Sequence, residues 1–186
     1  MERTPSVDEV RPSHCPRCGA ASRPVGAPLG LYGHGLRERQ FRGPLTPGGP
    51  PVLVLIHLRR YQCRTCKTVV TVGPRTAVRK RLFTAAAIGL GLALWAVRKM
   101  PEVMVRQRVS PWRCMGYAAA RGWRTLKRWA QAIDEGRLFP TVRPAPEGWS
   151  WRQVAERAAT TLAALAPPSL GAPVEELAFL GAARAG

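Results

Sequence analysis

Acidic side chains are scarce in this 186-residue sequence, which contains 11 Asp and Glu residues against 29 Lys and Arg residues. Asp8 and Asp134 are the two aspartates, and they stand far apart in the chain. Enzymes that use two metal ions hold them with several carboxylates in one place, and the sequence offers no such cluster. It also lacks a Gly-rich phosphate loop, a nucleophile elbow and a Ser/His/Asp set. We therefore expect a protein that is not an enzyme and has no small-molecule substrate.

Long apolar runs are also missing. The helix-forming stretch at residues 83–97 has 15 residues without a charge, with basic residues on both sides. At about 1.5 Å of rise per residue it would extend roughly 22 Å, whereas the hydrocarbon core of a bilayer is about 30 Å thick. We predict a buried core helix, the alternative being a membrane-associated segment. The polar N-terminus lacks the basic start and apolar stretch of a secretory signal, which favours a cytoplasmic location.

The positive charge, +18 in total, is concentrated in the middle of the chain. Residues 15–80 have a net charge of +11 and residues 81–140 a net charge of +8. Residues 1–14 have a net charge of −1, and residues 141–186 are neutral. A general preference for arginine would spread the charge evenly, so this distribution predicts a polyanionic partner for the central region.

Four of the five cysteines form two pairs with the same spacing, Cys15-Pro-Arg-Cys18 and Cys63-Arg-Thr-Cys66. A gap of two residues lets one tight turn present two thiolates to a single tetrahedral ion. Cytoplasmic thiols stay reduced, so paired cysteines favour metal binding over disulfides. The pattern predicts one structural Zn²⁺ with four sulfur ligands and no open position for water.

Two other interpretations of the cysteines remain open at this point. One is a redox pair of the thioredoxin type, which needs a Cys-x-x-Cys motif between a strand and a helix. The other is a mixed metal site that uses His14, His34 or His57 as a ligand. Cys63 and Cys66 lie between two predicted strands, which favours the four-cysteine site.

Composition divides the chain into a disordered leader at residues 1–13, a β-rich module at 14–74, a helical module at 78–140, a linker at 141–149 and C-terminal helices at 150–186. Strands are predicted at residues 36–41, 52–61 and 67–72. Helices are predicted at residues 82–98, 101–108, 110 to about 122, and 123–135. Ser150 and Gln153 form a capping box that predicts the start of a further helix.

The predicted helix at residues 123–135 has two distinct faces. Leu126, Trp129, Ala130 and Ile133 share one side, whereas Arg124, Arg128 and Gln131 point away from it. Arginine can bind guanine and glutamine can bind adenine with two hydrogen bonds each, and lysine or threonine can hold phosphates. The DNA-contacting residues that we expect are Arg121, Arg124, Thr125, Lys127, Arg128 and Gln131 in this region and Arg59, Arg60 and Arg64 in the cysteine-containing module.

The two cysteine motifs, together with the segment Thr125-Leu126-Lys127-Arg128-Trp129, resemble the N-terminal part of bacterial insertion-sequence transposases and small related families of unknown function. Such transposases carry a zinc ribbon followed by a helix-turn-helix. The resemblance covers residues 14–140 and implies binding to DNA. These transposases cleave DNA with three carboxylates in a longer downstream domain, which has no counterpart in this sequence.

We therefore predict an α+β protein with a small zinc-ribbon-like β module, an all-α helix-turn-helix module and C-terminal helices. The expected partner is double-stranded DNA, which implies a place at the nucleoid. The alternative is a zinc-ribbon scaffold that docks another protein or RNA. In that case Ala158, Leu162 and Leu165 could contact a partner or a second copy of the chain, although burial in the chain's own core is expected first.

Overall fold

The computed structural model describes residues 4–113, 115–117, 122–168 and 171–185, and it has a mixed α+β fold. The chain forms two compact units. The first comprises Met1–Gln40 and Leu55–Pro74, and the second comprises Phe41–Val54 and Arg75–Gly186. The boundary therefore falls within a long pair of strands, whereas composition alone places it near residue 74.

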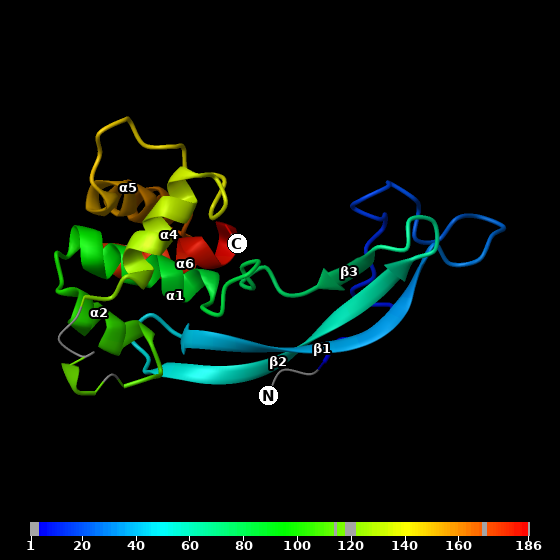
Figure 1. Ribbon diagram of the computed structural model, residues 1–186, viewed down its shortest axis with the longest axis horizontal. Coiled ribbons are helices and arrows are strands. Elements are labelled where there is room, and N and C mark those ends of the chain that lie inside the picture. Colours follow the sequence, from blue (N-terminus) through cyan, green and yellow to red (C-terminus); the bar gives the residue numbers. More distant parts are fainter. Residues whose placement is uncertain (1–3, 114, 118–121, 169–170, 186) are drawn as a thin grey trace. The chain divides into compact units, whose positions relative to one another are not determined.

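The β structure is a three-stranded sheet with the order β1-β2-β3. Its strands are β1 (Leu31–Pro44), β2 (Pro51–Cys63) and β3 (Val69–Val72). β2 pairs with β3 in the antiparallel direction, with Arg59 opposite Val72 and Gln62 opposite Val69 (Figure 1). The three predicted strands are confirmed, and the first two extend further than predicted. β1 includes Gly33 and Gly35, whose weak strand propensity hides its true start in the sequence.

The core of the first unit is small. Cys15, Leu31, Tyr61 and Cys63 are its buried members. Residues 4–13, for which composition predicts a disordered leader, lie against this core in the structure. Val7 and Val10 pack on it, and the Tyr61 hydroxyl donates a hydrogen bond of 2.5 Å to the Val7 carbonyl. The partial burial of these two valines explains why a polar segment lies in a defined place.

The second unit contains the helices of the described chain. They are α1 (Ala85–Leu92), a π-helical turn η1 (Ala93–Val97), α2 (Glu102–Val109), α4 (Thr125–Asp134), α5 (Trp151–Ala164) and α6 (Val174–Ala185). Every residue of α1 is buried, which confirms that the uncharged stretch at residues 83–97 is a core segment. Among the described residues, no helix has both the length and the apolar character needed to cross a bilayer.

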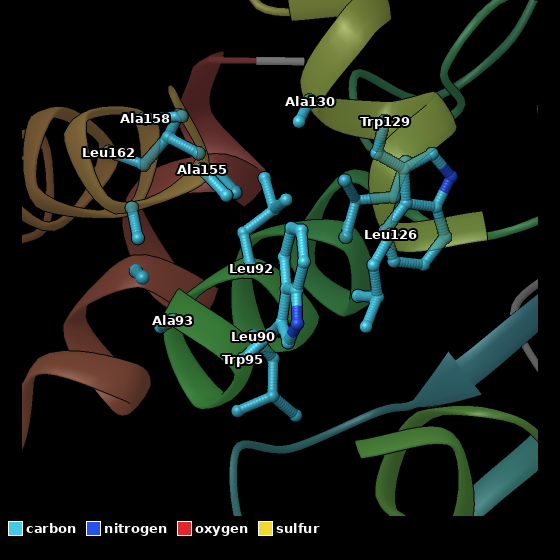
Figure 2. Close-up of a cluster of buried hydrophobic side chains, with 14 of the residues drawn as sticks. Leu90, Leu92, Ala93, Trp95, Leu126, Trp129, Ala130, Ala155, Ala158 and Leu162 are labelled. Atoms are coloured by element: carbon cyan, nitrogen blue, oxygen red, sulfur yellow. The ribbon is translucent and has the colours of Figure 1, made fainter. Parts of the chain in front are cut away.

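α1 is central because α4, α5 and α6 all contact it. Figure 2 shows side chains such as Leu92, Leu126 and Ala155 gathered in the core that these helices share. Gly89 lets α1 approach α6 closely, since a Cβ atom there would lie 2.5 Å from the Ala178 carbonyl oxygen. The helices therefore form one packed body.

The C-terminal helices belong to this same body. Ser150 and Gln153 form the predicted capping box at the start of α5. Ala158 and Leu162 are fully buried in the chain's own core, as expected, whereas Leu165 is 39 % exposed. The predicted linker also packs on this unit, because Val142 is buried and the Ala145 N–H donates to Asp134 Oδ1 at 2.9 Å.

The helix predicted to start at Ser110 and Pro111 does not start there. Ser110 instead ends α2, and its backbone N–H donates to the Arg106 carbonyl at 2.8 Å. Its hydroxyl accepts a hydrogen bond of 3.3 Å from the Trp112 N–H, so residues 111 and 112 form a bend. A serine before proline supports either a helix start or this turn, and here the turn prevails. Arg121 lies outside the described residues.

Candidate metal centre and nucleic-acid interface

The structure brings together the four cysteines that the sequence predicts as ligands. The sulfur atoms of Cys15, Cys18, Cys63 and Cys66 all lie within 4.8 Å of one another. Two of the distances, Cys15 Sγ to Cys66 Sγ and Cys18 Sγ to Cys63 Sγ, are 3.7 Å. Four sulfurs around a tetrahedral ion at about 2.3 Å would be about 3.8 Å apart. The four side chains are therefore positioned to hold one metal ion.

Each cysteine pair sits in the same kind of backbone turn. The Cys15 N–H donates to the Ala20 carbonyl at 2.9 Å, and its carbonyl accepts from the Gly19 N–H at 2.9 Å. Cys63 makes the same two bonds, at 3.0 Å each, with the residues five and four positions further along the chain. The repeated geometry explains why the two motifs have the same spacing.

The residue after the second cysteine of each pair has a left-handed backbone. Gly19 has a φ of 72° and Lys67 a φ of 60°. Glycine adopts this conformation without steric cost, whereas lysine pays about 1 kcal/mol or more for it. The Lys67 N–H donates to the Cys63 carbonyl at 3.0 Å, so this strained residue closes the turn that holds Cys63 and Cys66.

Hydrogen bonds also alter the acidity of the thiols. Bonds from the side chain and the N–H of Thr68 lower the pKa of Cys66 to about 6. The Cys66 N–H lowers the pKa of Cys63. The Ala20 N–H acts in the same direction on Cys18, but burial and the three neighbouring thiols together raise the pKa of Cys18 to about 11. Four sulfurs crowded in this way need a cation in order to be thiolates together.

The structure does not support the two other interpretations of the cysteines. Among the described residues, no histidine or carboxylate joins the four-cysteine group. His14, His34 and His57 are all exposed. Cys63 ends β2 and Cys66 precedes β3, so the second pair lies between strands and not at a strand-to-helix junction.

The predicted DNA contacts of the first unit do not form one surface. The Arg59 Nε donates a hydrogen bond of 2.8 Å to the Pro5 carbonyl. Arg60 is half-buried and alternates with Arg59 along β2, so it points to the other face of the sheet. Arg64 is exposed in the turn between the second pair of cysteines. No local pattern indicated a hydrogen bond between Arg59 and residues 4–13.

The predicted contacts on α4 do share one surface. The faces of this helix divide as the sequence predicts, because Leu126, Trp129, Ala130 and Ile133 are buried. Thr125 is half-buried. The exposed members of the set are Arg124, Lys127, Arg128 and Gln131.

The buried side of α4 holds this exposed row firmly. The Trp129 ring packs edge-on against Phe83 and Trp123, with a distance of 5.2 Å between ring centroids in each case. On the exposed side, Gln131 Nε2 donates to Glu135 Oε1 at 2.9 Å. Within the described chain, Arg124, Lys127 and Arg128 make no ion pair with an acidic side chain. Their charges are therefore available to a ligand.

Sequence reasoning missed one exposed aromatic group. Trp112 follows α2, is 53 % exposed, and has the Arg42 guanidinium 5.8 Å from its ring centroid. The signal in the sequence was a tryptophan beside Arg113 in a segment without acidic residues. We did not single out Trp112 from the sequence because a helix was predicted over this segment.

No protein-family model, curated protein or solved structure matches this chain. The resemblance to transposases therefore stays a prediction from the sequence motifs. The function has to be inferred from the cysteine geometry, the exposed row on α4 and the charge.

Proposed function

We propose that this chain is a zinc-stabilised protein that binds double-stranded DNA and has no catalytic activity of its own. The observation that carries the proposal is the row of exposed basic and amide side chains on α4, whose opposite face is fixed in the core. The concentration of charge in residues 15–140 supports it, because DNA is a polyanion.

The metal in this proposal is Zn²⁺, held by Cys15, Cys18, Cys63 and Cys66. Four thiolates in a tetrahedron are a typical structural zinc site, and they leave no position for a reacting water molecule. The ion would supply folding free energy to a unit whose core has few buried residues. Its role is therefore to organise the first unit.

Recognition in this proposal belongs to α4. Arg124 and Arg128 have the chemistry to bind guanine edges, and Gln131 has the chemistry to bind adenine. Lys127 and the arginines of the first unit would add attraction to phosphates without sequence preference. On this basis the chain would act as the targeting region of a transposase does. A helix-turn-helix built on α4 stays part of the proposal, because the segment before α4 includes residues outside those described.

The proposal is tested by measuring the affinity of the zinc-loaded chain for duplexes selected from a random pool, over a range of salt concentrations. Neutralisation of several phosphates makes the logarithm of the binding constant fall steeply and linearly with the logarithm of the salt concentration. We expect such a fall, by roughly tenfold or more between about 50 and 200 mM salt. An affinity that hardly changes with salt, or a clear preference for structured RNA over every selected duplex, would contradict the proposal.

A further inference from the structure

The segment that begins with the bend after α2 exposes large apolar side chains in a short stretch of chain. Trp112 is 53 % exposed, Met115 is 84 % exposed and Tyr117 is 77 % exposed. Single exposed apolar residues are common on proteins, whereas several large ones close together in the chain make this segment a candidate for an interaction site. We call these three residues the aromatic bend.

The surroundings of the aromatic bend are cationic. Residues 104–117 contain three arginines and no acidic residue. In the sequence Arg108 precedes Trp112 and Arg113 follows it, and both arginines are exposed. A partner that covers this surface must therefore offer apolar faces and negative charge together.

Trp112 is held in place from one side. The Arg42 guanidinium lies 5.8 Å from the centre of its ring, which is within the range of a cation–π contact. Arg42 itself is fixed by its backbone, because its N–H donates to the Leu82 carbonyl at 2.9 Å and its carbonyl accepts from the Thr84 N–H at 3.2 Å. A ring supported in this way pays little entropy when a flat group stacks on it.

We propose that the aromatic bend binds single-stranded DNA, with an unpaired base stacked on Trp112 and the neighbouring phosphates held by Arg108 and Arg113. Proteins that bind single strands combine aromatic side chains with a basic track in this way. Paired bases in a duplex are stacked on each other and cannot offer their faces to Trp112. The inference goes beyond the proposed function and stands on residues other than those of α4.

The interleaving of charges favours a nucleic acid over an anionic membrane. A membrane surface needs a continuous apolar side that enters the lipid. Here Arg113 directly follows Trp112, and the Arg42 guanidinium covers one side of the ring. An aromatic ring with guanidinium groups next to it instead matches a base with phosphates next to it.

The test compares two probes, an oligothymidylate of about 20 nucleotides and a duplex of about the same length. Fluorescence anisotropy gives the dissociation constants of the zinc-loaded chain and of Trp112→Ala, Trp112→Phe and Trp151→Ala. Trp151 is the matched control, because it is a tryptophan with a similar exposure of 41 % in α5. Circular dichroism of each variant verifies that it is folded.

We expect Trp112→Ala to weaken oligothymidylate binding by about tenfold, and Trp112→Phe to restore most of it, because stacking is lost and then regained. Duplex binding should change by less than about twofold in both variants, and Trp151→Ala should match the unmodified chain. An equal loss for both probes, or no loss for either, would overturn the inference. Loss of binding to phosphatidylglycerol vesicles with oligothymidylate binding unchanged would also overturn it. Duplex binding through α4 is tested by its salt dependence and by Arg128→Ala, neither of which involves Trp112, so the two proposals are tested separately.

Discussion

At the scale of single residues, the proposed metal binding and the proposed DNA binding depend on two different sets of side chains. The four cysteines and Gly19 form the candidate metal centre, and exposed cations on α4 face the proposed ligand. The first set is tested through stability and the second through DNA affinity. Because the residues of each set lie in different units, their effects should separate cleanly.

Gly19→Ala should destabilise the first unit. The φ of 72° at this position is strained for any residue with a Cβ atom, so we expect a loss of about 1 kcal/mol in the free energy of unfolding. Gly48→Ala is the matched control, since its Cβ would also meet open space but its φ is not positive. Urea unfolding of the zinc-loaded chain measures both. Equal stability of the two variants would show that the Gly19 turn does not require glycine.

Arg128→Ala should weaken binding to selected duplexes by about 1 to 3 kcal/mol and relax the preference for one base pair. Arg128 is exposed, so the fold should be unaffected. Arg184→Ala removes another exposed arginine, in α6, and should leave the affinity within about twofold of the unmodified chain. The same loss on every DNA sequence would make Arg128 a phosphate contact. Unchanged affinity would remove α4 from the interface.

At the scale of elements, the second unit is held together by helices that pack closely on one another. Gly89→Ala in α1 should destabilise the chain by about 1 to 3 kcal/mol, because the new methyl group would meet Ala178 and Ala182 of α6. In an open helix the same change would stabilise by roughly 1 kcal/mol, so the sign of the effect identifies the contact. Thermal unfolding followed by circular dichroism measures it. Increased stability would contradict the packing of α1 on α6.

The elements that could be predicted from the sequence are those with local signals. The apolar run of β2, the two faces of α4 and the capping box at Ser150 each lie within a few neighbouring residues. The features that could not be predicted depend on distant partners. Val7 packs on the cluster that contains Tyr61. The bend after Ser110 forms because Ser110 ends α2 and its hydroxyl accepts from the Trp112 N–H.

In the candidate site, too, the features with local sequence signals could be predicted and those that depend on distant segments could not. Cysteine spacing alone predicted all four members of the metal centre, because each pair is a local turn. The pairing of Arg59 with Pro5 and of Arg42 with Trp112 joins segments far apart in the chain, and no local pattern indicates it. The two faces of α4 follow the sequence pattern, and Arg59 and Arg60 lie on opposite faces of β2, as the two-residue period of a strand implies.

At the scale of the whole molecule, the two units differ in what holds them together. The second unit buries most of its apolar residues in one helical core. Among the described residues, the buried cluster of the first unit has four members, and two of them belong to the four-cysteine group. A core of this size offsets little of the entropy lost on folding. We therefore propose that a bound metal ion keeps the first unit ordered.

Metal analysis of the purified chain tests this claim most directly. Elemental mass spectrometry should find one zinc ion per chain, and Cys63→Ser should reduce that ratio sharply because one of the four sulfur ligands is lost. A chelator that removes the ion should unfold the first unit while the helical signal of the second remains. A chain purified without stoichiometric zinc or another metal, and folded to the same extent with and without chelator, would contradict the account.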